Sequence, residues 1–88
     1  MRNDELITQF LLYEEKVKAL SENTRKNYSI DLEKLLGFAG ERNLDFASFA
    51  FSDAKEFMRE LKRQNLSDRS SSRILVSCHT FFAYLERN

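Results

Sequence analysis

The stretch LSENTRKNYSIDL, residues 20–32, marks the start of a helix and the first turns of its buried face. Ser21 is a suitable N-cap, because a serine oxygen accepts a hydrogen bond from a backbone N–H group of the first turn. Beyond the cap, apolar residues recur at three- and four-residue steps, as on one face of an amphipathic helix. The stripe consists of Tyr28, Leu32, Leu35, Leu36 and Ala39. Gly40 or Asn43 is expected to end the helix, since both tolerate the left-handed conformation of a C-cap.

Three further segments have the same helical periodicity. The first is expected from Asp4 to Ala19, with Asn3 as N-cap. Its apolar stripe is Leu6, Phe10, Tyr13, Val17 and Leu20. The third begins at Ser52 as N-cap and closes at residues 64–65. Its buried stripe is Ala54, Phe57, Met58 and Leu61. Ser67 caps the fourth. Its core face is Ile74, Leu75, Cys78, Phe81, Phe82 and Leu85.

Residues 44–51, LDFASFAF, alternate apolar and polar side chains as a β-strand does. No second strand is available to pair with this segment, so we expect a compact connector instead. Phe46, Phe49 and Phe51 are expected to lie in the core. Leu66 is expected to pack beneath the turn that precedes the fourth helix.

The composition agrees with a single helical domain that covers residues 1–88. Proline is absent and glycine occurs only twice, so few residues interrupt helices. Eight Phe and three Tyr supply enough apolar area for a packed core, which excludes a disordered chain. The expected fold class is all-α, a compact bundle of four helices.

The sequence lacks the residues that several classes of function require. One cysteine excludes an internal disulfide, and one cysteine with one histidine cannot form a zinc site. No apolar run approaches the ~20 residues of a membrane span, and the acidic N-terminus is unlike a signal peptide. The sequence has no phosphate-binding loop, acid–base pair or nucleophile elbow. We therefore predict no catalytic residue, no metal, no cofactor and no membrane contact, and a cytoplasmic protein.

Charge is balanced overall and uneven along the chain. The 14 basic and 14 acidic residues give a net charge of zero, which by itself argues against nucleic acid as a partner. Residues 1–15 contain one basic and four acidic residues, whereas residues 16–34 contain five basic and three acidic residues. A domain with one basic face is compatible with the neutral total.

The face of the fourth helix opposite its core has the chemistry of a DNA-contacting helix. Its outward residues are Arg69, Ser72, Arg73, Val76 and Thr80, with Ser70 and Ser77 flanking them. Arginine binds phosphate or the guanine edge, and hydroxyl groups bind phosphate at short range. Val76 suits a thymine methyl group, and no carboxylate follows Asp68 on this face. A solvated serine-rich surface is the alternative interpretation.

The first turn of the second helix is a second candidate contact, because unpaired backbone N–H groups and the helix dipole favour an anion there. Asn23, Lys26 and Asn27 are expected to project outward, with Arg25 over the edge of the core. Ser21 and Thr24 have an alternative role as caps of the helix. Glu22 weakens the argument for an anion.

Three chemically distinctive residues are interpreted as structural. Cys78 lies on an apolar face and is expected to be a small core residue. His79 has no second histidine or carboxylate cluster close in sequence, which favours a structural role at the core boundary. Asp31 lies beside the core stripe of the second helix, and we expect it to bond the end of a neighbouring helix.

Two motifs resemble the N-terminal core-binding domain of tyrosine recombinases, in particular the Xer-type and phage-integrase group. Residues 20–32 resemble the family pattern L-S-x-N-T-x-x-x-Y-x-x-D-L. The matching residues are Leu20, Ser21, Asn23, Thr24, Tyr28, Asp31 and Leu32. Residues 65–85, NLSDRSSSRILVSCHTFFAYL, resemble a second pattern of the family. The matching residues there are Leu66, Ser67, Arg69, Ser70, Arg73, Leu75, Phe81, Phe82 and Leu85.

This resemblance implies an orthogonal four-helix, SAM-like domain that binds double-stranded DNA and clamps one side of a recombination site. It implies a catalytic domain outside this chain, so the chain itself is not an enzyme, and contacts with other recombinase protomers on DNA. The resemblance transfers a DNA-binding role to Asn23, Thr24, Arg25, Lys26, Arg69, Ser70 and Arg73. Helix geometry adds Asn27, Ser72 and Ser77.

The chain departs from the family pattern at three outward positions. Val76 stands where the family often has serine, His79 where it often has arginine, and Ile30 where many relatives have a basic residue. The missing basic groups at the positions of His79 and Ile30, together with the zero net charge, predict weak DNA binding by the isolated domain. Because Val76 and Ile30 are apolar, a helical protein-interaction module that mediates recombinase assembly is the alternative function.

Overall fold

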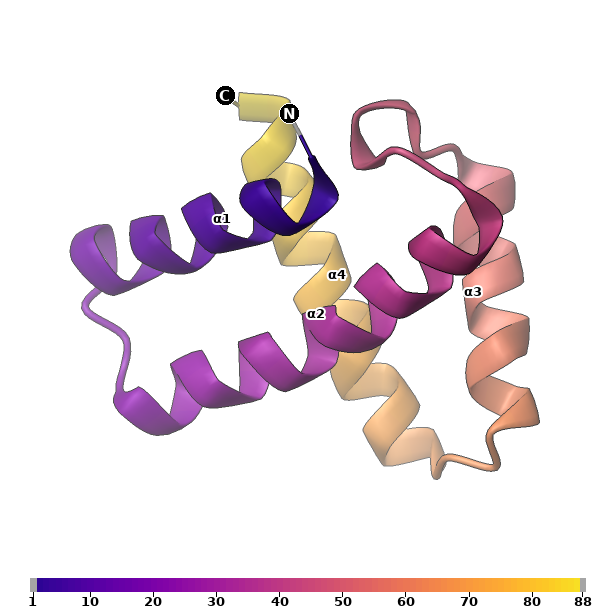
Figure 1. Cartoon of the computed structure of the whole chain (residues 1–88). Helices are drawn as coiled ribbons and strands as arrows, with labels where there is room; N and C mark the ends of the chain where they lie inside the picture. Colours follow the sequence, from indigo (N-terminus) through magenta and orange to yellow (C-terminus); the bar gives the residue numbers. More distant parts are fainter. Residues whose placement is uncertain (1, 88) are drawn as a thin grey trace.

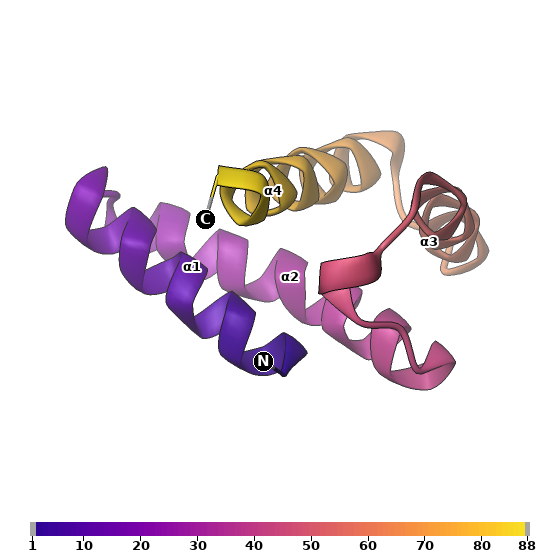
Figure 2. The same cartoon turned by 90° about the horizontal axis from the view of Figure 1, so that it is seen from above.

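The computed structural model describes residues 2–87, and these residues form four α-helices and one short 3₁₀ helix. The elements are α1 (Asn3–Val17), α2 (Glu22–Arg42), η1 (Phe46–Ser48), α3 (Phe51–Arg63) and α4 (Asp68–Arg87). Helices α1 and α2 form one hairpin, and α3 and α4 form a second hairpin that crosses the first steeply (Figure 1). Seen from above, α4 lies across one side of the α1–α2 pair, with α3 at the edge (Figure 2). The predicted all-α, four-helix fold is confirmed.

Two of the predicted serine caps are confirmed. The Oγ atom of Ser21 accepts a hydrogen bond from the Thr24 N–H group at 3.3 Å, and that of Ser67 accepts one from the Ser70 N–H group at 3.1 Å. Each bond satisfies a backbone donor that has no partner inside its helix. Asn43 ends α2 with a φ of 54°, the left-handed conformation expected of an asparagine C-cap.

The cap predicted at Ser52 is wrong, because the N-cap of α3 lies two residues earlier. Ala50 occupies the N-cap position, and its N–H group donates to the Asp53 carboxylate at 2.8 Å. The carboxylate lies in the first turn of α3, where the helix dipole also favours negative charge. The start of α3 is therefore stabilised by the side chain of Asp53, inside the helix, and not by the predicted N-cap Ser52.

Asn3 has a different role from the predicted one. It is the first residue of α1, and Arg2 occupies the N-cap position. The Asn3 amide nitrogen donates to the Leu44 carbonyl oxygen at 2.8 Å, and the amide oxygen accepts from the Phe46 N–H group at 2.9 Å. Asn3 thus joins the start of α1 to the connector that follows α2, more than forty residues away in sequence.

Aromatic side chains from separate elements form the centre of the core. The Phe10 ring of α1 makes edge contacts with Tyr28, Phe81 and Tyr84, at ring-centroid distances of 5.4–5.7 Å. The ring of Phe46 also meets Phe81, at 5.3 Å. The buried apolar residues are Ile7, Phe10, Leu32, Leu35, Phe38, Ala39, Phe46, Phe57, Leu61, Ile74, Cys78 and Phe81. Every helix and the connector contribute, so the two hairpins share one core.

Three residues predicted to be buried are exposed: Val17 by 63%, Phe51 by 77% and Met58 by 42%. Val17 is the last residue of α1, and the line that this helix buries contains Glu14 instead. The apolar pattern treated Glu14 as a polar, exposed residue. The predicted buried face of α1 was therefore shifted from the observed one, which contains Glu14. Helix α3 packs chiefly against α4, so only one side of α3 is covered and Met58 stays outside. Phe51 stands at the first turn of α3, beyond that contact.

We expect the substitution Asn3→Ala to destabilise the fold. It removes both hydrogen bonds to the connector and leaves a part-buried carbonyl and N–H group without their partner. The loss should be about 1–3 kcal/mol in the free energy of unfolding, measured by urea denaturation. Thr8→Ala is the control, because the Thr8 hydroxyl bonds only a carbonyl of its own helix. Equal stability of the two variants would contradict the bridging role of Asn3.

Candidate nucleic-acid interface

A shallow groove between α2 and α4 brings the two predicted contact segments together. Its volume is about 210 Å³. The residues that line it are Thr24, Asn27, Tyr28, Asp31, Arg73, Val76 and Ser77. The groove exists because α4 lies across α2 in the crossing of the two hairpins (Figure 2). The first turns of α2 and the middle of α4 therefore share one surface.

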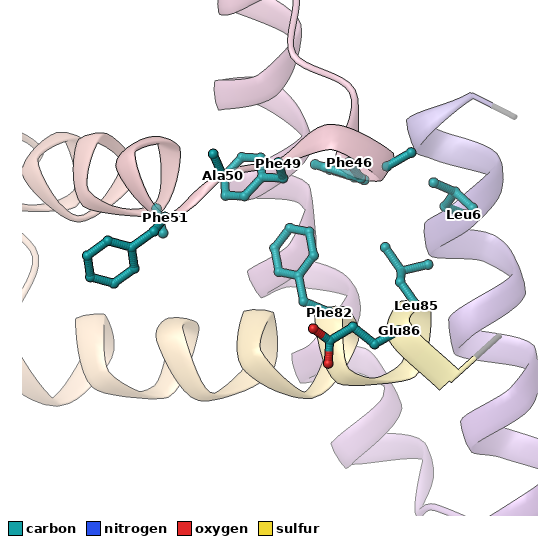
Figure 3. Close-up of a pocket in the computed structure, with 10 residues that line it drawn as sticks. Leu6, Phe46, Phe49, Ala50, Phe51, Phe82, Leu85 and Glu86 are labelled. Carbon is teal, nitrogen blue, oxygen red and sulfur yellow. The ribbon is translucent and has the colours of Figure 1, made fainter.

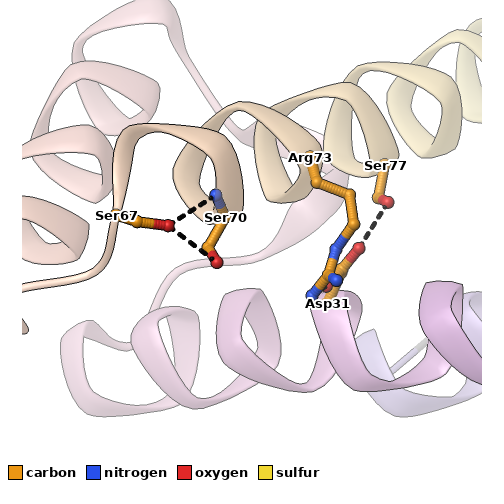
Figure 4. A network of polar contacts seen from close by, with 5 residues as sticks. All are labelled: Asp31, Ser67, Ser70, Arg73 and Ser77. Carbon is orange, nitrogen blue, oxygen red and sulfur yellow. Dashed lines mark hydrogen bonds and ion pairs between the residues drawn. The ribbon is translucent and has the colours of Figure 1, made fainter.

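A buried carboxylate lies at the base of this groove (Figure 4). Asp31 is buried. Its Oδ1 atom accepts from Arg73 Nη2 at 3.0 Å, and its Oδ2 atom accepts from the Ser77 hydroxyl at 2.8 Å. Both donors come from α4. The prediction that Asp31 bonds a neighbouring helix is confirmed, although its partners lie in the middle of that helix and not at its end.

Arg73 is anchored and accessible at the same time. Its side chain remains 54% exposed while one of its nitrogen atoms bonds Asp31. A guanidinium group has five N–H donors, so one bond to a carboxylate leaves others for a further acceptor. An acceptor above the groove can therefore reach Arg73 without breaking the bond to Asp31.

Ser77 departs from its predicted place on the flank of the outer face. It is only 5% exposed, and its hydroxyl donates to Asp31. The crossing of α4 over α2 covers this side of α4, which a projection of one isolated helix does not reveal. Ser77 therefore has a role inside the groove, and its hydroxyl donor is already used by Asp31 and not free for a phosphate.

Two other predicted contacts take part in helix caps. The Ser67 hydroxyl donates to the Ser70 hydroxyl oxygen at 3.1 Å, and Ser70 is half-buried (Figure 4). The hydroxyl groups of Ser21 and Thr24 share a hydrogen bond of 3.0 Å. Thr24 nevertheless stays exposed at the rim of the groove. Both residues thus shape the helix starts that border the candidate surface.

The predicted residues of α2 divide between two sides of the helix. Thr24 and Asn27 border the groove toward α4. Arg25 and Lys26 line a separate hollow toward α1, and the Arg25 Nε atom lies 3.6 Å from a carboxylate oxygen of Glu15. The charge of Arg25 is thus partly engaged by α1. Thr24 and Asn27 therefore share the groove with Arg73, whereas Arg25 and Lys26 line a different hollow.

Sequence reasoning missed one cation on this side of α2. Lys34 follows Asn27 by seven residues, which is two helical turns, so the two residues share a face. Asn23, Asn27, Ile30 and Lys34 form one stripe at three- and four-residue steps. Lys34 is half-buried and Ile30 is exposed. The spacing alone could have identified Lys34.

The outer face of α4 is exposed as predicted at its main positions. Arg69 and Ser72 are exposed, and Val76 is 63% exposed. Arg69 forms no ion pair with any residue in the range 2–87. The Thr80 hydroxyl, by contrast, donates to the Val76 carbonyl oxygen at 3.0 Å. The groove between this face and the α2 stripe has one carboxylate in its lining, Asp31, which is buried and paired with Arg73. We refer to Asn23, Asn27, Lys34, Arg69, Ser72, Arg73 and Val76 as the α2–α4 surface.

A larger hollow elsewhere in residues 2–87 is chemically different. It has a volume of about 730 Å³ and lies between the connector, the start of α3 and the end of α4 (Figure 3). Its walls are mainly apolar, with Phe46, Phe49 and Phe82 among them, and Glu86 is the one charged residue in its lining. No cation lines it, so this hollow does not suit phosphate.

Cys78 and His79 fit structural or solvent roles. Cys78 is buried, as predicted, and burial raises the pKa of its thiol to about 12, with the negative charge of Asp31 acting in the same direction. His79 is exposed. Within residues 2–87, no group of three His, Cys, Asp or Glu side chains is arranged to hold a metal ion. None of the helices in this range has the length and apolar character of a membrane span.

The class that these features define is a small four-helix domain with an acid-poor surface across two crossed helices. Residues 7–88 match the family described as phage integrase, N-terminal SAM-like domain. The chain belongs to this family. The resemblance found in the two sequence motifs is therefore confirmed. No solved structure matches the chain at a significant level.

The similar curated proteins are tyrosine recombinases. XerC of Staphylococcus saprophyticus is 37% identical over 81 residues, which is 91% of this chain and 27% of that protein. XerD of Vibrio cholerae is 37% identical over 84 residues, or 93% of this chain and 27% of that protein. XerD of Yersinia pestis is 31% identical over 86 residues, or 98% of this chain and 29% of that protein. The chain thus spans less than a third of the length of these relatives.

We expect the Cys78 thiol of the folded protein to resist modification at pH 8. The nucleophile is the thiolate, and raising the pKa from 9.0 to about 12 lowers its concentration about a thousandfold. Reaction with a disulfide reagent should be negligible until the chain is unfolded in denaturant, where it should become complete. Rapid modification of the native protein at pH 8 would contradict the burial of this group.

Proposed function

We propose that this chain is the DNA-binding domain of a site-specific tyrosine recombinase and binds double-stranded DNA along the α2–α4 surface. The observation that carries the proposal is the groove in which Arg73 is anchored on α4 beside the exposed first turns of α2. Family membership and the printed names of the relatives support the recombinase assignment.

Each residue type on the α2–α4 surface suits a particular part of a duplex. Arg69 and Arg73 bind phosphate or guanine edges, and Ser72 binds phosphate at short range. The amides of Asn23 and Asn27 bind phosphate or adenine edges. Val76 offers an apolar contact for a thymine methyl group. Most of these contacts position the domain on the backbone, and few of them read sequence.

The neutral net charge implies that affinity depends on few phosphate contacts. Each phosphate neutralised by a cation lowers log K by ~0.9 per unit of log salt concentration. The α2–α4 surface has three cations, and one of them is paired with Asp31. Weak binding by the domain alone is therefore the natural consequence. In the parent recombinase, a catalytic domain would bind the opposite face of the site, in the cytoplasm, together with other protomers.

We expect Arg69→Ala to weaken binding to duplex DNA without unfolding the domain. Arg69 is exposed and forms no ion pair within residues 2–87, so its removal breaks no ion pair there. The slope of log K against log salt should become shallower by about 0.9, measured by fluorescence anisotropy across a salt series. Arg73 is a poorer probe, since its removal would leave Asp31 buried without its cation.

The matched control is Lys55→Ala on α3, which removes one cation beside Phe51 and away from the proposed surface. This variant should bind DNA with the same salt slope as the unaltered protein. If both substitutions reduce binding equally, only the total charge matters and the α2–α4 surface is not the binding site.

Protein–protein contact is the second candidate function, and the exposure of two apolar residues favours it. Val76 is 63% exposed and Ile30 is 46% exposed. On this hypothesis the domain contributes to recombinase assembly by self-association. Sedimentation at high protein concentration without DNA should then detect a dimer, and Val76→Asp should dissociate it. A monomer at every concentration would eliminate this candidate for the isolated domain.

A further inference from the structure

The contact between Asp31 and Arg73 joins a buried acid to a half-exposed base. The Asp31 side chain is 1% exposed, whereas that of Arg73 is 54% exposed. Water therefore screens the carboxylate little. A buried carboxylate that loses its cation is left uncompensated in a medium of low dielectric constant, which is strongly unfavourable. The bond should therefore persist when another group approaches Arg73 from outside.

The Ser77 hydroxyl fixes the second oxygen of the same carboxylate. It donates to Oδ2 at 2.8 Å while Arg73 donates to Oδ1 at 3.0 Å (Figure 4). With both oxygens engaged from one helix, the carboxylate cannot rotate away from Arg73 without losing a buried hydrogen bond. One nitrogen of the guanidinium group is thus held from inside the fold.

We propose that Asp31 is a positioning residue that holds Arg73 at the mouth of the α2–α4 groove and offsets its charge. This inference rests on the proposed DNA-binding function and specifies how Arg73 contributes to it. Arg73 presents its remaining N–H groups to a phosphate or base edge in one fixed orientation. The positive charge of Arg73 is offset by Asp31. Arg73 therefore contributes directed hydrogen bonds to the contact and little non-specific electrostatic attraction for DNA.

The proposal has an unusual consequence: removal of the acid should strengthen unselective binding. In Asp31→Asn the amide has the shape of the carboxylate and can still bond Ser77, so the variant loses the negative charge and the charged contact that holds Arg73. The guanidinium group then acts as a free cation. We expect tighter binding to duplexes of mixed sequence, with a salt slope steeper by about 0.9.

The decisive experiment measures the affinity of the unaltered protein and of Asp31→Asn for mixed-sequence duplexes across a salt series. Circular dichroism first establishes that both proteins are folded. A steeper slope and higher affinity for Asp31→Asn support the proposal, because a merely structural role would weaken binding. An unchanged slope, or a uniform loss of affinity by a folded variant, overturns it. Asp45→Asn is the charge-matched control, since this exposed acid lies in the connector and its substitution should leave the slope unaltered.

A second measurement needs no DNA. In the unaltered protein, ¹⁵N NMR should detect a guanidinium group of Arg73 with restricted rotation, and Asp31→Asn should restore fast averaging. Fast averaging in both proteins overturns the anchor itself. If instead the anchor is present and neither protein binds DNA, the proposed function fails and Asp31 is a structural residue only.

Should Asp31→Asn fail to fold, Arg73→Lys tests the same idea without altering the buried acid. Lysine keeps the charge but lacks the planar fork that can bond a carboxylate and a phosphate together. A several-fold lower affinity with little change in salt slope supports the positioning role. Full affinity in Arg73→Lys overturns it, because charge alone would then suffice.

Discussion

The packing of α4 across α2 creates the core and the candidate binding surface in one contact. On the inner side of the crossing, apolar residues of both helices belong to one buried cluster, among them Leu32 and Leu35 of α2 and Ile74 and Phe81 of α4. At the edge of the same contact, α2 supplies the buried carboxylate of Asp31, which binds two side chains of α4. The relative position of the two helices is thus fixed by apolar and polar contacts together.

A polar contact at this place restricts how the helices can slide. Apolar side chains tolerate small shifts, because burial of area has no direction. The two hydrogen bonds of Asp31 have defined lengths and angles, and a shift along α4 would break both. Burying a charge costs free energy that a well-packed apolar pair would not cost. In exchange, the contact fixes the spacing between the outer faces of α2 and α4. This spacing decides whether both faces can contact a rigid duplex at the same time.

The helices of this fold were predictable from the sequence because their signals are local. Ser21 and Ser67 cap their helices, and the apolar faces of α2 and α4 are buried largely as expected. The errors arise where a distant element decides. Asn3 bonds a connector more than forty residues away, and Met58 is exposed because α3 is covered from one side only. Neither fact is contained in the periodicity of the helix concerned.

The candidate site was predictable as two segments but not as an arrangement of atoms. Projection of α4 as an isolated cylinder put Ser77 beside the outer face, whereas the crossing helix covers it. The same projection could not reveal that Arg73 meets Asp31, because their separation of 42 residues leaves no local trace.

Net charge has the same weakness as single-helix projection, since it counts residues without placing them. The 14 acids cancel the 14 bases, yet Glu14 and Asp31 are buried, each within 3.5 Å of a basic group. A duplex approaching the α2–α4 surface would interact with exposed arginines and amides. The net charge of the whole chain does not describe this local surface. At distances beyond about 10 Å, salt screens the remaining charges from it. A neutral domain is therefore compatible with a phosphate-binding face, provided that its carboxylates lie elsewhere or are paired inside the fold.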